Sequence, residues 1–244
     1  MISDKEIIQR FKVRPTDKVL DIGGSMRQRD EINVHTLVDI IPPEEAPYGA
    51  SKLKAENFVK VDITKDKLPF KDKEFDFCIC SHTLEDLSSP FLIIDEMARV
   101  SKRGLIITPS MGADMVFSHI DFTDWLTGAR RIPGNGHHKW FFYKHGGKIR
   151  IIPKNFPVLY TSKFQVVGWK GEDEFIHYWE DKIDYEKGDD VNIYKLIGEY
   201  ERYIKNQKLK IKKGRALIFI DNPTFYLKEF VRLLLKRGQG FKYR

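Results

Sequence analysis

Acidic residues lie at or near the ends of three successive apolar segments in the first quarter of the chain. Asp21 lies in the first segment, Asp39 ends the segment 36–39, and Asp62 ends the segment 58–62. The carboxyl ends of parallel strands meet at one edge of a sheet, and a carboxylate at the end of the second strand can accept both ribose hydroxyls of a nucleoside. The spacing therefore predicts a nucleotide-like ligand at that edge. On any single strand, the alternative is a solvated acid or a helix N-cap.

Two glycines follow the first of these segments. Residues 19–22 have strand character and run directly into Gly23 and Gly24. A buried parallel strand that ends in glycines turns too tightly for side chains, so the backbone can approach a ligand closely. Glycine turns of this kind also occur as plain connectors, and the turn needs the surrounding pattern to support a binding site.

Strand and helix signals alternate in the first half of the chain, which is the pattern that would position these residues. Apolar spacing predicts helices at 4–11 and 90–100, and strands at 19–22, 36–39, 58–62, 75–80 and 104–108. Such alternation predicts an α/β fold with a doubly wound, mostly parallel sheet and right-handed crossovers. The strand-end residues would then line the crevice where the strand order reverses.

Seven short motifs carry a resemblance to a known family. They are Val19–Gly24, Val38–Asp39, Val61–Ile63, Leu68–Phe70, Phe75–Asp76, His82–Asp86 and Glu96–Val100. In this order and spacing, over residues 13–110, they resemble the class I S-adenosylmethionine-dependent methyltransferases, and most of all the type 11 group. The order of the motifs, rather than any one of them, makes the resemblance specific.

The resemblance implies S-adenosylmethionine as the cofactor and a set of residues that would contact it. They are Asp21, Gly23, Gly24, Ser25, Asp39, Ile40, Asp62, Ile63 and Ser81. The turn would pass beneath the methionine part, Asp39 would bind the ribose, and Asp62 with Ile63 would hold the adenine. The family usually has glycine where Ser25 and Arg27 stand. Arg27 could pair with the cofactor carboxylate, or the pocket is degraded.

Methyl transfer needs alignment of the acceptor with the methyl group, and a hydroxyl acceptor also needs a base. His82 is the first candidate, because it follows the predicted fourth strand and imidazole titrates near neutral pH. Its alternative roles are a cofactor contact or a loop cap. His137 and His138 are second candidates, and strand alternation predicts that only one of them faces the crevice.

Residues 111–157 form an insert after the fifth strand and are expected to make a lid over the cofactor crevice. A glycine pair between β-prone runs predicts a hairpin over 137–152. Packing on the sheet is the favoured role for its aromatic residues 140–142. His82–Asp86 followed by His137–Trp140 also resembles a subgroup of bacterial and archaeal methyltransferases associated with surface-glycan assembly.

The whole chain is expected to be one methyltransferase domain. It would consist of a cofactor-binding core at 13–110, the insert at 111–157, and C-terminal strands and helices at 158–244. A strand is expected at 164–168, a helix at 191–205, a strand at 214–220 and a basic amphipathic helix at 223–237. That last helix would pack on its own domain, or contact a membrane surface or a partner.

Composition limits the classes of protein and partner. The sequence has no apolar run of membrane-spanning length and no visible secretory signal, so a cytoplasmic protein is expected. Cys78 and Cys80 lie two apart on one expected strand face and are interpreted as core residues, and the histidine spacing predicts no metal site. The net charge of +7 suggests an anionic partner, such as a phosphorylated substrate, nucleic acid or membrane, or simply solvated lysines.

Three functions stay open at this point. An oxygen of a small molecule or glycan is the favoured methyl acceptor, because no Asn-Pro-Pro-Tyr or Asp-Pro-Pro-Tyr, the family signature for nitrogen methylation, follows the fourth strand. An RNA methyltransferase is supported only by the charge and predicts steep salt dependence. A non-catalytic module that keeps the fold is the third, with the altered glycine turn as its sign. The oligomeric state is not predicted.

Overall fold

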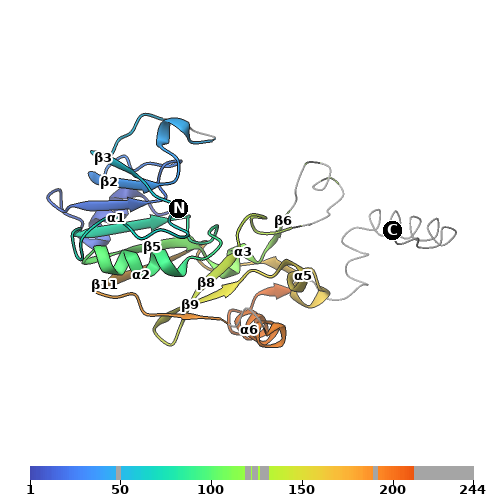
Figure 1. Ribbon diagram of the computed structural model, residues 1–244. Helices are drawn as coiled ribbons and strands as arrows, with labels where there is room; N and C mark the ends of the chain where they lie inside the picture. Colours follow the sequence, from blue (N-terminus) through green and yellow to red (C-terminus); the bar gives the residue numbers. More distant parts are fainter. Residues whose placement is uncertain (48–50, 119–121, 123–125, 127–131, 189–191, 212–244) are drawn as a thin grey trace, which may run out of the picture. The chain divides into compact units, whose positions relative to one another are not determined.

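The structure is a computed structural model that describes residues 1–47, 51–118, 122, 126, 132–188 and 192–211 (Figure 1). The chain divides into two compact units. The first consists of Met1–Met111, His137–Lys154 and Glu172–Leu196, and the second of Gly112–Gly136, Asn155–Gly171 and Ile197–Arg244. The predicted core and hairpin belong to the first unit. The organisation as one domain stays a prediction.

A six-stranded sheet forms the centre of the first unit. Its strands are β1 (Val19–Ile22), β2 (Val34–Asp39), β3 (Asn57–Lys60), β4 (Phe77–Ser81), β5 (Arg103–Pro109) and β11 (Glu174–Glu180), in the spatial order β11-β5-β4-β1-β2-β3. All neighbouring strands are parallel except β11, which runs antiparallel to β5. The strand order reverses at β1, so the predicted doubly wound, mostly parallel sheet is confirmed.

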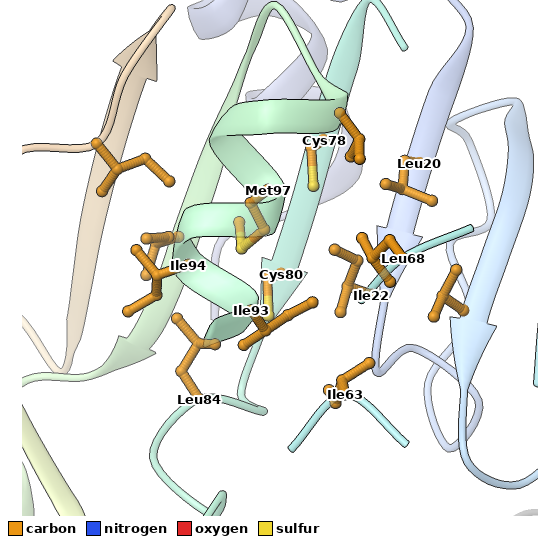
Figure 2. Packing of buried hydrophobic residues seen from close by; sticks show 14 of the residues in the cluster. Leu20, Ile22, Ile63, Leu68, Cys78, Cys80, Leu84, Ile93, Ile94 and Met97 are labelled. Atoms are coloured by element: carbon orange, nitrogen blue, oxygen red, sulfur yellow. The ribbon is translucent and has the colours of Figure 1, made fainter. Parts of the chain in front are cut away.

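Two helices cover the two faces of the sheet, and the alternation of side chains along each strand explains how. Alternate residues along the strands, such as Leu20 and Ile106, pack in the cluster that contains the apolar side of α2 (Phe91–Val100). The residues between them, such as Val19 and Leu105, point to the opposite face and pack with α1 (Asp4–Phe11). Figure 2 shows the α2 side of this core.

The two cysteines confirm this alternation. Cys78 and Cys80 are both buried, are not linked by a disulfide, and lie on the face that α2 covers (Figure 2). Burial raises the pKa of both thiols above the usual range. They are core residues, as their spacing predicted.

Helix α1 begins and ends as predicted. The side chain of Ser3 accepts a hydrogen bond from the Glu6 backbone N–H at 3.2 Å and so caps the first turn. The helix ends at Phe11, because the next residue, Lys12, adopts a left-handed conformation with φ of 53°. Helix α2 begins at Phe91 and ends at the predicted Val100.

The edges of several predicted strands are wrong by a few residues. The second strand begins at Val34 rather than at residue 36. The third strand ends at Lys60 rather than Asp62, because Asp62 accepts hydrogen bonds from Thr64 and starts a turn. The fourth begins at Phe77 rather than 75, because Asp76 caps the backbone N–H of Lys18 instead of continuing the ladder. The strand expected at 164–168 is shortened to β10 (Val166–Gly168), which follows the 3₁₀ helix η2 (Ser162–Phe164).

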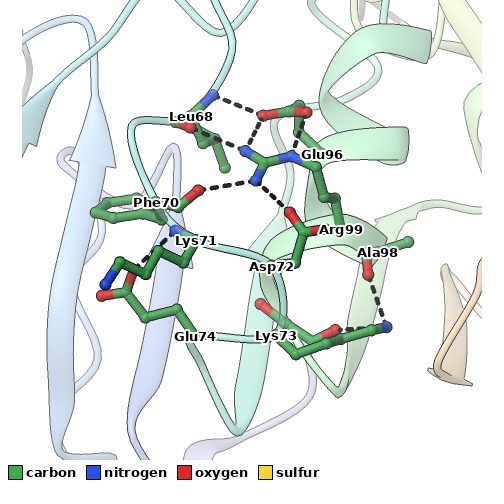
Figure 3. Close-up of polar contacts among 10 residues, drawn as sticks. Leu68, Phe70, Lys71, Asp72, Lys73, Glu74, Glu96, Ala98 and Arg99 are labelled. Carbon is green, nitrogen blue, oxygen red and sulfur yellow. Dashed lines mark hydrogen bonds and ion pairs between the residues drawn. The ribbon is translucent and has the colours of Figure 1, made fainter.

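Arg99 connects α2 to the loop that precedes β4. Its guanidinium donates two hydrogen bonds to the carboxylate of Glu96, at 2.8 and 2.7 Å, and others to the carbonyl oxygens of Leu68 and Phe70 (Figure 3). The Glu96 carboxylate also accepts from the backbone N–H of Leu68. Two of the motifs that carried the resemblance, Leu68–Phe70 and Glu96–Val100, are thus one structural clamp.

The predicted hairpin is confirmed. Strands β8 (Trp140–His145) and β9 (Lys148–Pro153) are antiparallel, and β12 (Tyr185–Lys187) extends them into a three-stranded sheet. The glycine pair between them, Gly146 and Gly147, has φ of 56° and 82°, the conformation that a two-residue hairpin turn requires. Trp140 is buried with its ring 5.2 Å from that of Phe91, so the aromatic residues pack internally, as expected.

The second unit is smaller. Its elements include β6 (Phe117–Ser118) paired with β7 (Ile132–Pro133), β10 paired with β13 (Lys210–Ile211), and α5 (Phe156–Leu159). Helix α3 (Met111–Asp114) begins at Met111, the last residue of the segment 1–111 of the first unit. Helix α6 (Ile193–Asn206) corresponds to the predicted helix at 191–205. The hydroxyl of its buried Tyr200 accepts a hydrogen bond from the backbone N–H of Asn155. The expected strand at 214–220 and helix at 223–237 lie outside the described residues.

The described helices give no candidate for a transmembrane segment, since none of them is both long and apolar enough to cross a bilayer. The remaining short element of the first unit is the 3₁₀ helix η1 (Pro43–Glu45), within the proline-containing connection between β2 and β3.

Candidate functional site

The glycine turn lies at the carboxyl end of β1, where the strand order reverses. Gly23 has φ of 75°, and its N–H donates to the carbonyl oxygen of Val38 in β2 at 2.8 Å. A Cβ atom at Gly23 would lie 2.3 Å from the hydroxyl oxygen of Thr83. Both the backbone conformation and the lack of space therefore require glycine there.

Asp21 supports the same turn from below. A Cβ atom on Gly24 would lie 2.4 Å from the Asp21 Oδ2 atom, so the turn rests directly on this carboxyl group. Burial raises the pKa of Asp21 to about 6, and the Arg29 guanidinium, whose Nε lies 4.0 Å from Oδ2, opposes that shift only in part. The Asp21 carboxyl group therefore lies directly against the glycine turn.

A cavity of about 950 Å³ opens beside the turn, within the size range of small-molecule sites. Six of the predicted site residues line it. They are the predicted cofactor contacts Asp21, Gly23, Gly24 and Ser81, and the catalytic candidates His82 and His137. The geometry can therefore place a ligand in contact with both the turn and the two histidines.

Asp39 closes the turn from the end of β2. Its Oδ2 atom accepts a hydrogen bond from the Ser25 backbone N–H at 3.0 Å, and its Oδ1 atom accepts from its neighbour Ile40 at 2.7 Å. A carboxylate oxygen has two lone pairs, so acceptor capacity remains for hydroxyl groups. The Ile40 side chain is exposed, whereas the Ser25 hydroxyl is buried with no hydrogen-bond partner among the described residues.

Asp62 is engaged within its own turn. Its Oδ1 atom accepts hydrogen bonds from the Thr64 hydroxyl and backbone, and its Oδ2 atom lies 2.9 Å from the Lys65 ammonium. The Thr64 and Lys65 contacts lower the pKa of Asp62 to about 2, so it is ionised at neutral pH. Ile63 is buried in the α2-side core. The predicted adenine contacts of both residues stay untested.

His82 lies between two carboxylates. Its Nε2 atom is 2.7 Å from Glu174 and its Nδ1 atom is 3.4 Å from Glu85. Burial lowers the pKa of His82, but the two carboxylates outweigh that effect and raise the pKa overall. The residue also has φ of 51°, an uncommon conformation for a non-glycine residue that is frequent at functional sites. The imidazolium form is therefore favoured.

The two adjacent histidines precede β8 rather than belong to it, because that strand begins at Trp140. The strand-alternation argument therefore does not apply to them. His137 lies in a turn and is exposed, while His138 is buried. Their Nε2 atoms lie 3.7 and 4.0 Å from the same Asp86 Oδ1 atom.

The contacts of two residues at the site, Glu174 and Arg29, were missed from the sequence. Glu174 lies on β11, far along the chain from His82, and its contact requires the antiparallel pairing of β11 with β5. Arg29 donates to Asp4 of α1 at 3.2 Å and approaches Asp21, so it ties the helix to the turn. Arg29 lies in the polar connection between β1 and β2, but nothing in the sequence indicated its contacts with Asp4 and Asp21.

Comparison with protein families supports the resemblance. A family model described as a methyltransferase domain matches residues 26–108, which span the connection after the glycine turn through β5. The family that the ordered motifs resemble is therefore confirmed for residues 26–108, and S-adenosylmethionine is the cofactor of that family. The match ends before the hairpin.

The chain is also similar to individual proteins. It is 34% identical over 109 residues, 41% of its length, to the uncharacterized protein MJ1123 of Methanocaldococcus jannaschii. The chain spans about half of the length of that relative, 50%.

Two solved structures resemble part of the chain. An S-adenosylmethionine-dependent methyltransferase from Aquifex aeolicus is 22% identical, with 43% of this chain and 63% of that chain covered and a TM-score of 0.32. A Thermotoga maritima methyltransferase, titled a possible histamine N-methyltransferase, is 14% identical, with 72% and 87% covered and a TM-score of 0.39.

Proposed function

From the premise that residues 26–108 are a class I S-adenosylmethionine-dependent methyltransferase domain, we propose that this protein methylates an oxygen of a small molecule or a glycan. The observation that carries the proposal is the cavity at the reversal of strand order, lined at once by the glycine turn and by His82 and His137. One side of such a cavity suits the cofactor, and the histidines suit an acceptor that must lose a proton.

The turn and its neighbours fit the cofactor. Gly23 and Gly24 allow the backbone to lie against the methionine part, because neither position has room for a Cβ atom. The exposed Arg27 lines the cavity and would pair with the cofactor carboxylate. Asp39 would bind the ribose hydroxyls, and Asp62 with Ile63 would contact the adenine. When bound, S-adenosylmethionine supplies a methyl group that its sulfonium already activates.

His82 is the proposed base for a hydroxyl acceptor. Glu85 and Glu174 stabilise the imidazolium that forms when the ring takes a proton, and the same contacts hold the ring at the cavity wall. Only the neutral ring can take a proton, so His82 acts as base from the fraction of molecules in which it is not yet protonated, and one of the two carboxylate contacts must give way to the acceptor. Residues 111–157 stay predicted as a lid, and 223–237 as a peripheral contact with a membrane or partner.

Two other functions remain as alternatives to this proposal. The net charge of +7 favours an RNA acceptor, for which binding would weaken steeply with added salt while sugars would not be methylated. A non-catalytic module is favoured by Ser25 and Arg27, which replace glycines of the family turn. An acceptor screen that includes glycans, hydroxylated small molecules and RNA distinguishes the first two.

Calorimetric titration with S-adenosylmethionine and with S-adenosylhomocysteine tests the proposal. Binding of both ligands at micromolar concentrations is expected of an enzyme that must release its product. If neither ligand bound at millimolar concentration, the methyltransferase proposal would be wrong and the non-catalytic module would be favoured. The test needs no knowledge of the acceptor.

A further inference from the structure

We propose that Asp86, His137 and His138 form a binding site for a divalent transition-metal cation. Each of the three side chains offers one ligand atom, and these atoms all lie within 4.8 Å of one another. Both imidazole Nε2 atoms face the same carboxylate oxygen, Asp86 Oδ1. The sequence predicted no metal site, because the acid and the histidines come from segments far apart in the chain.

The backbone holds the two segments together. The N–H groups of Lys139 and Trp140 both donate to the carbonyl oxygen of Glu85, at 2.6 and 3.3 Å, and the Trp140 indole donates to the carbonyl oxygen of Leu87. Residues 85–87 and 138–140 are therefore fixed side by side, with Asp86 opposite the histidine pair. The cluster is built into the fold rather than formed by chance approach of long side chains.

The separations suit one bound cation. Imidazole nitrogens and carboxylate oxygens bind zinc tetrahedrally at about 2.0–2.2 Å, so two ligands of one ion lie about 3.3–3.6 Å apart. The two separations from Asp86 Oδ1, 3.7 and 4.0 Å, are longer than this by only a few tenths of an ångström. The exposed His137 ring has room to rotate and close the remaining gap.

The donor set also selects the class of metal. Two imidazoles and one carboxylate favour zinc, manganese, iron or cobalt over magnesium and calcium, which prefer oxygen ligands alone. The Asp86 Oδ1 atom is enclosed by the protein yet receives no hydrogen bond from any described residue. Nearby, Glu85 is 1% exposed, and its carboxylate faces the His82 ring with 3.4 Å between Oε1 and Nδ1. Two neighbouring carboxylates, Glu85 and Asp86, thus place negative charge beside the histidine pair, which favours a cation.

The site opens toward the cavity of the proposed function. Asp86 and His137 both line that cavity, together with His82 and the glycine turn. Three protein ligands leave coordination positions for further groups, which is typical of metal sites that bind a substrate. In the proposed function, the cation would bind the acceptor oxygen and favour loss of its proton. This catalytic role rests on the proposed function, whereas the binding of the metal does not.

Titration of the full chain with Co²⁺ tests the site, with heat and visible ligand-field absorption as the readouts and no cofactor present. We expect one equivalent to bind, and Mg²⁺ to compete poorly. Asp86→Asn and His137→Ala should each weaken Co²⁺ binding at least tenfold. His145→Ala, an exposed histidine on the same hairpin, is the matched control and should leave the affinity unchanged.

A parallel titration with S-adenosylhomocysteine separates the two proposals. If S-adenosylhomocysteine bound but Co²⁺ bound the wild type no better than the Asp86→Asn variant, the cluster would be a set of ion pairs and the metal proposal would be wrong. If Co²⁺ bound as expected and the ligand did not, the metal site would stand and the proposed function would fail. Circular dichroism of each variant checks that the fold is retained.

Discussion

Asp39 at the end of β2 accepts a hydrogen bond from the backbone N–H of Ser25, with 3.0 Å between Oδ2 and N. One carboxylate thus fixes the outer end of the glycine turn, while Asp21 supports its base. In the family that the motifs resemble, the acid at this position is expected to bind ribose. The same group can do both, because its oxygens have unused lone pairs.

Asp39→Asn should weaken the binding of S-adenosylhomocysteine about tenfold or more. The amide keeps one acceptor oxygen but loses the charge, and hydrogen bonds to charged groups contribute about 1.5–3 kcal/mol. Isothermal calorimetry gives the dissociation constants. Asp66→Asn removes an exposed carboxylate and serves as the control. Equal affinity of the Asp39 variant and the wild type would show that this acid does not contact the ligand.

Gly23→Ala should abolish measurable binding of the same ligand while leaving much of the fold intact. Alanine at φ of 75° is strained by about 1 kcal/mol or more, and its Cβ would overlap the Thr83 side chain, so the turn must move. Gly136→Ala is the control, since a Cβ there meets no atom within 4 Å. Comparable affinities for the two variants would contradict the proposed position of the cofactor against the turn.

His82→Ala should reduce turnover at least a hundredfold once an acceptor is identified, with little change in the affinity for S-adenosylhomocysteine. General-base catalysis typically contributes factors of 10² to 10⁴, and in the proposed role the ring contacts the acceptor rather than the cofactor. The rate constant at saturating substrates and the dissociation constant are measured together. Turnover within a few-fold of the wild type would eliminate His82 as the base.

The protein without cofactor should lose stability as the pH rises from about 4 to 6, through Asp21. Its pKa is about 6 when folded, above the ordinary value of 3.8, because it is buried with Asp4 and Asp39 nearby, and Arg29 and the Ile22 backbone compensate only in part. Well below pH 4, Asp21 is protonated in both the folded and the unfolded protein, whereas above pH 6 the folded protein must keep a buried carboxylate. The free energy of unfolding is therefore lower above pH 6 by about 3 kcal/mol.

Urea unfolding of the wild type and Asp21→Asn at pH 4 and pH 7 measures this effect. The asparagine variant cannot ionise, so the free energy of unfolding of the wild type relative to the variant should fall by about 2–3 kcal/mol between the two pH values. A relative free energy that stays constant, or that rises with pH, would contradict a raised pKa for Asp21.

The sequence predicted the inner strands of the central sheet well because β1, β4 and β5 are almost entirely buried and are bounded by glycine, proline or charged residues, whereas the half-buried β11 was not predicted. The run Val19–Ile22 is one example: all four residues are buried. The site was predicted less completely, because its residues meet through tertiary pairing. Glu174 reaches His82 only through the antiparallel β11, and Asp86 reaches the histidine pair only through hydrogen bonds from the hairpin to residue 85. No local pattern encodes either contact.

Arg99→Met should destabilise the first unit by about 3 kcal/mol. The substitution keeps most of the apolar stem but removes the guanidinium from Glu96, a carboxylate that is only 4% exposed. A buried charge that loses its partner is strongly destabilising, whereas an exposed pair contributes about 1 kcal/mol or less. Arg10→Ala, which breaks the exposed pair with Glu6, is therefore the matched control.

A double variant distinguishes loss of the pair from loss of the other Arg99 hydrogen bonds. Glu96→Gln removes the charge that Arg99→Met leaves unpaired, so the double variant should recover part of the stability lost in the single variant. Urea unfolding monitored by circular dichroism gives all four free energies. If the two substitutions were simply additive, the clamp between α2 and the loop before β4 would depend on the hydrogen bonds from Arg99 to the carbonyl oxygens of Leu68 and Phe70, and the charge argument would be wrong.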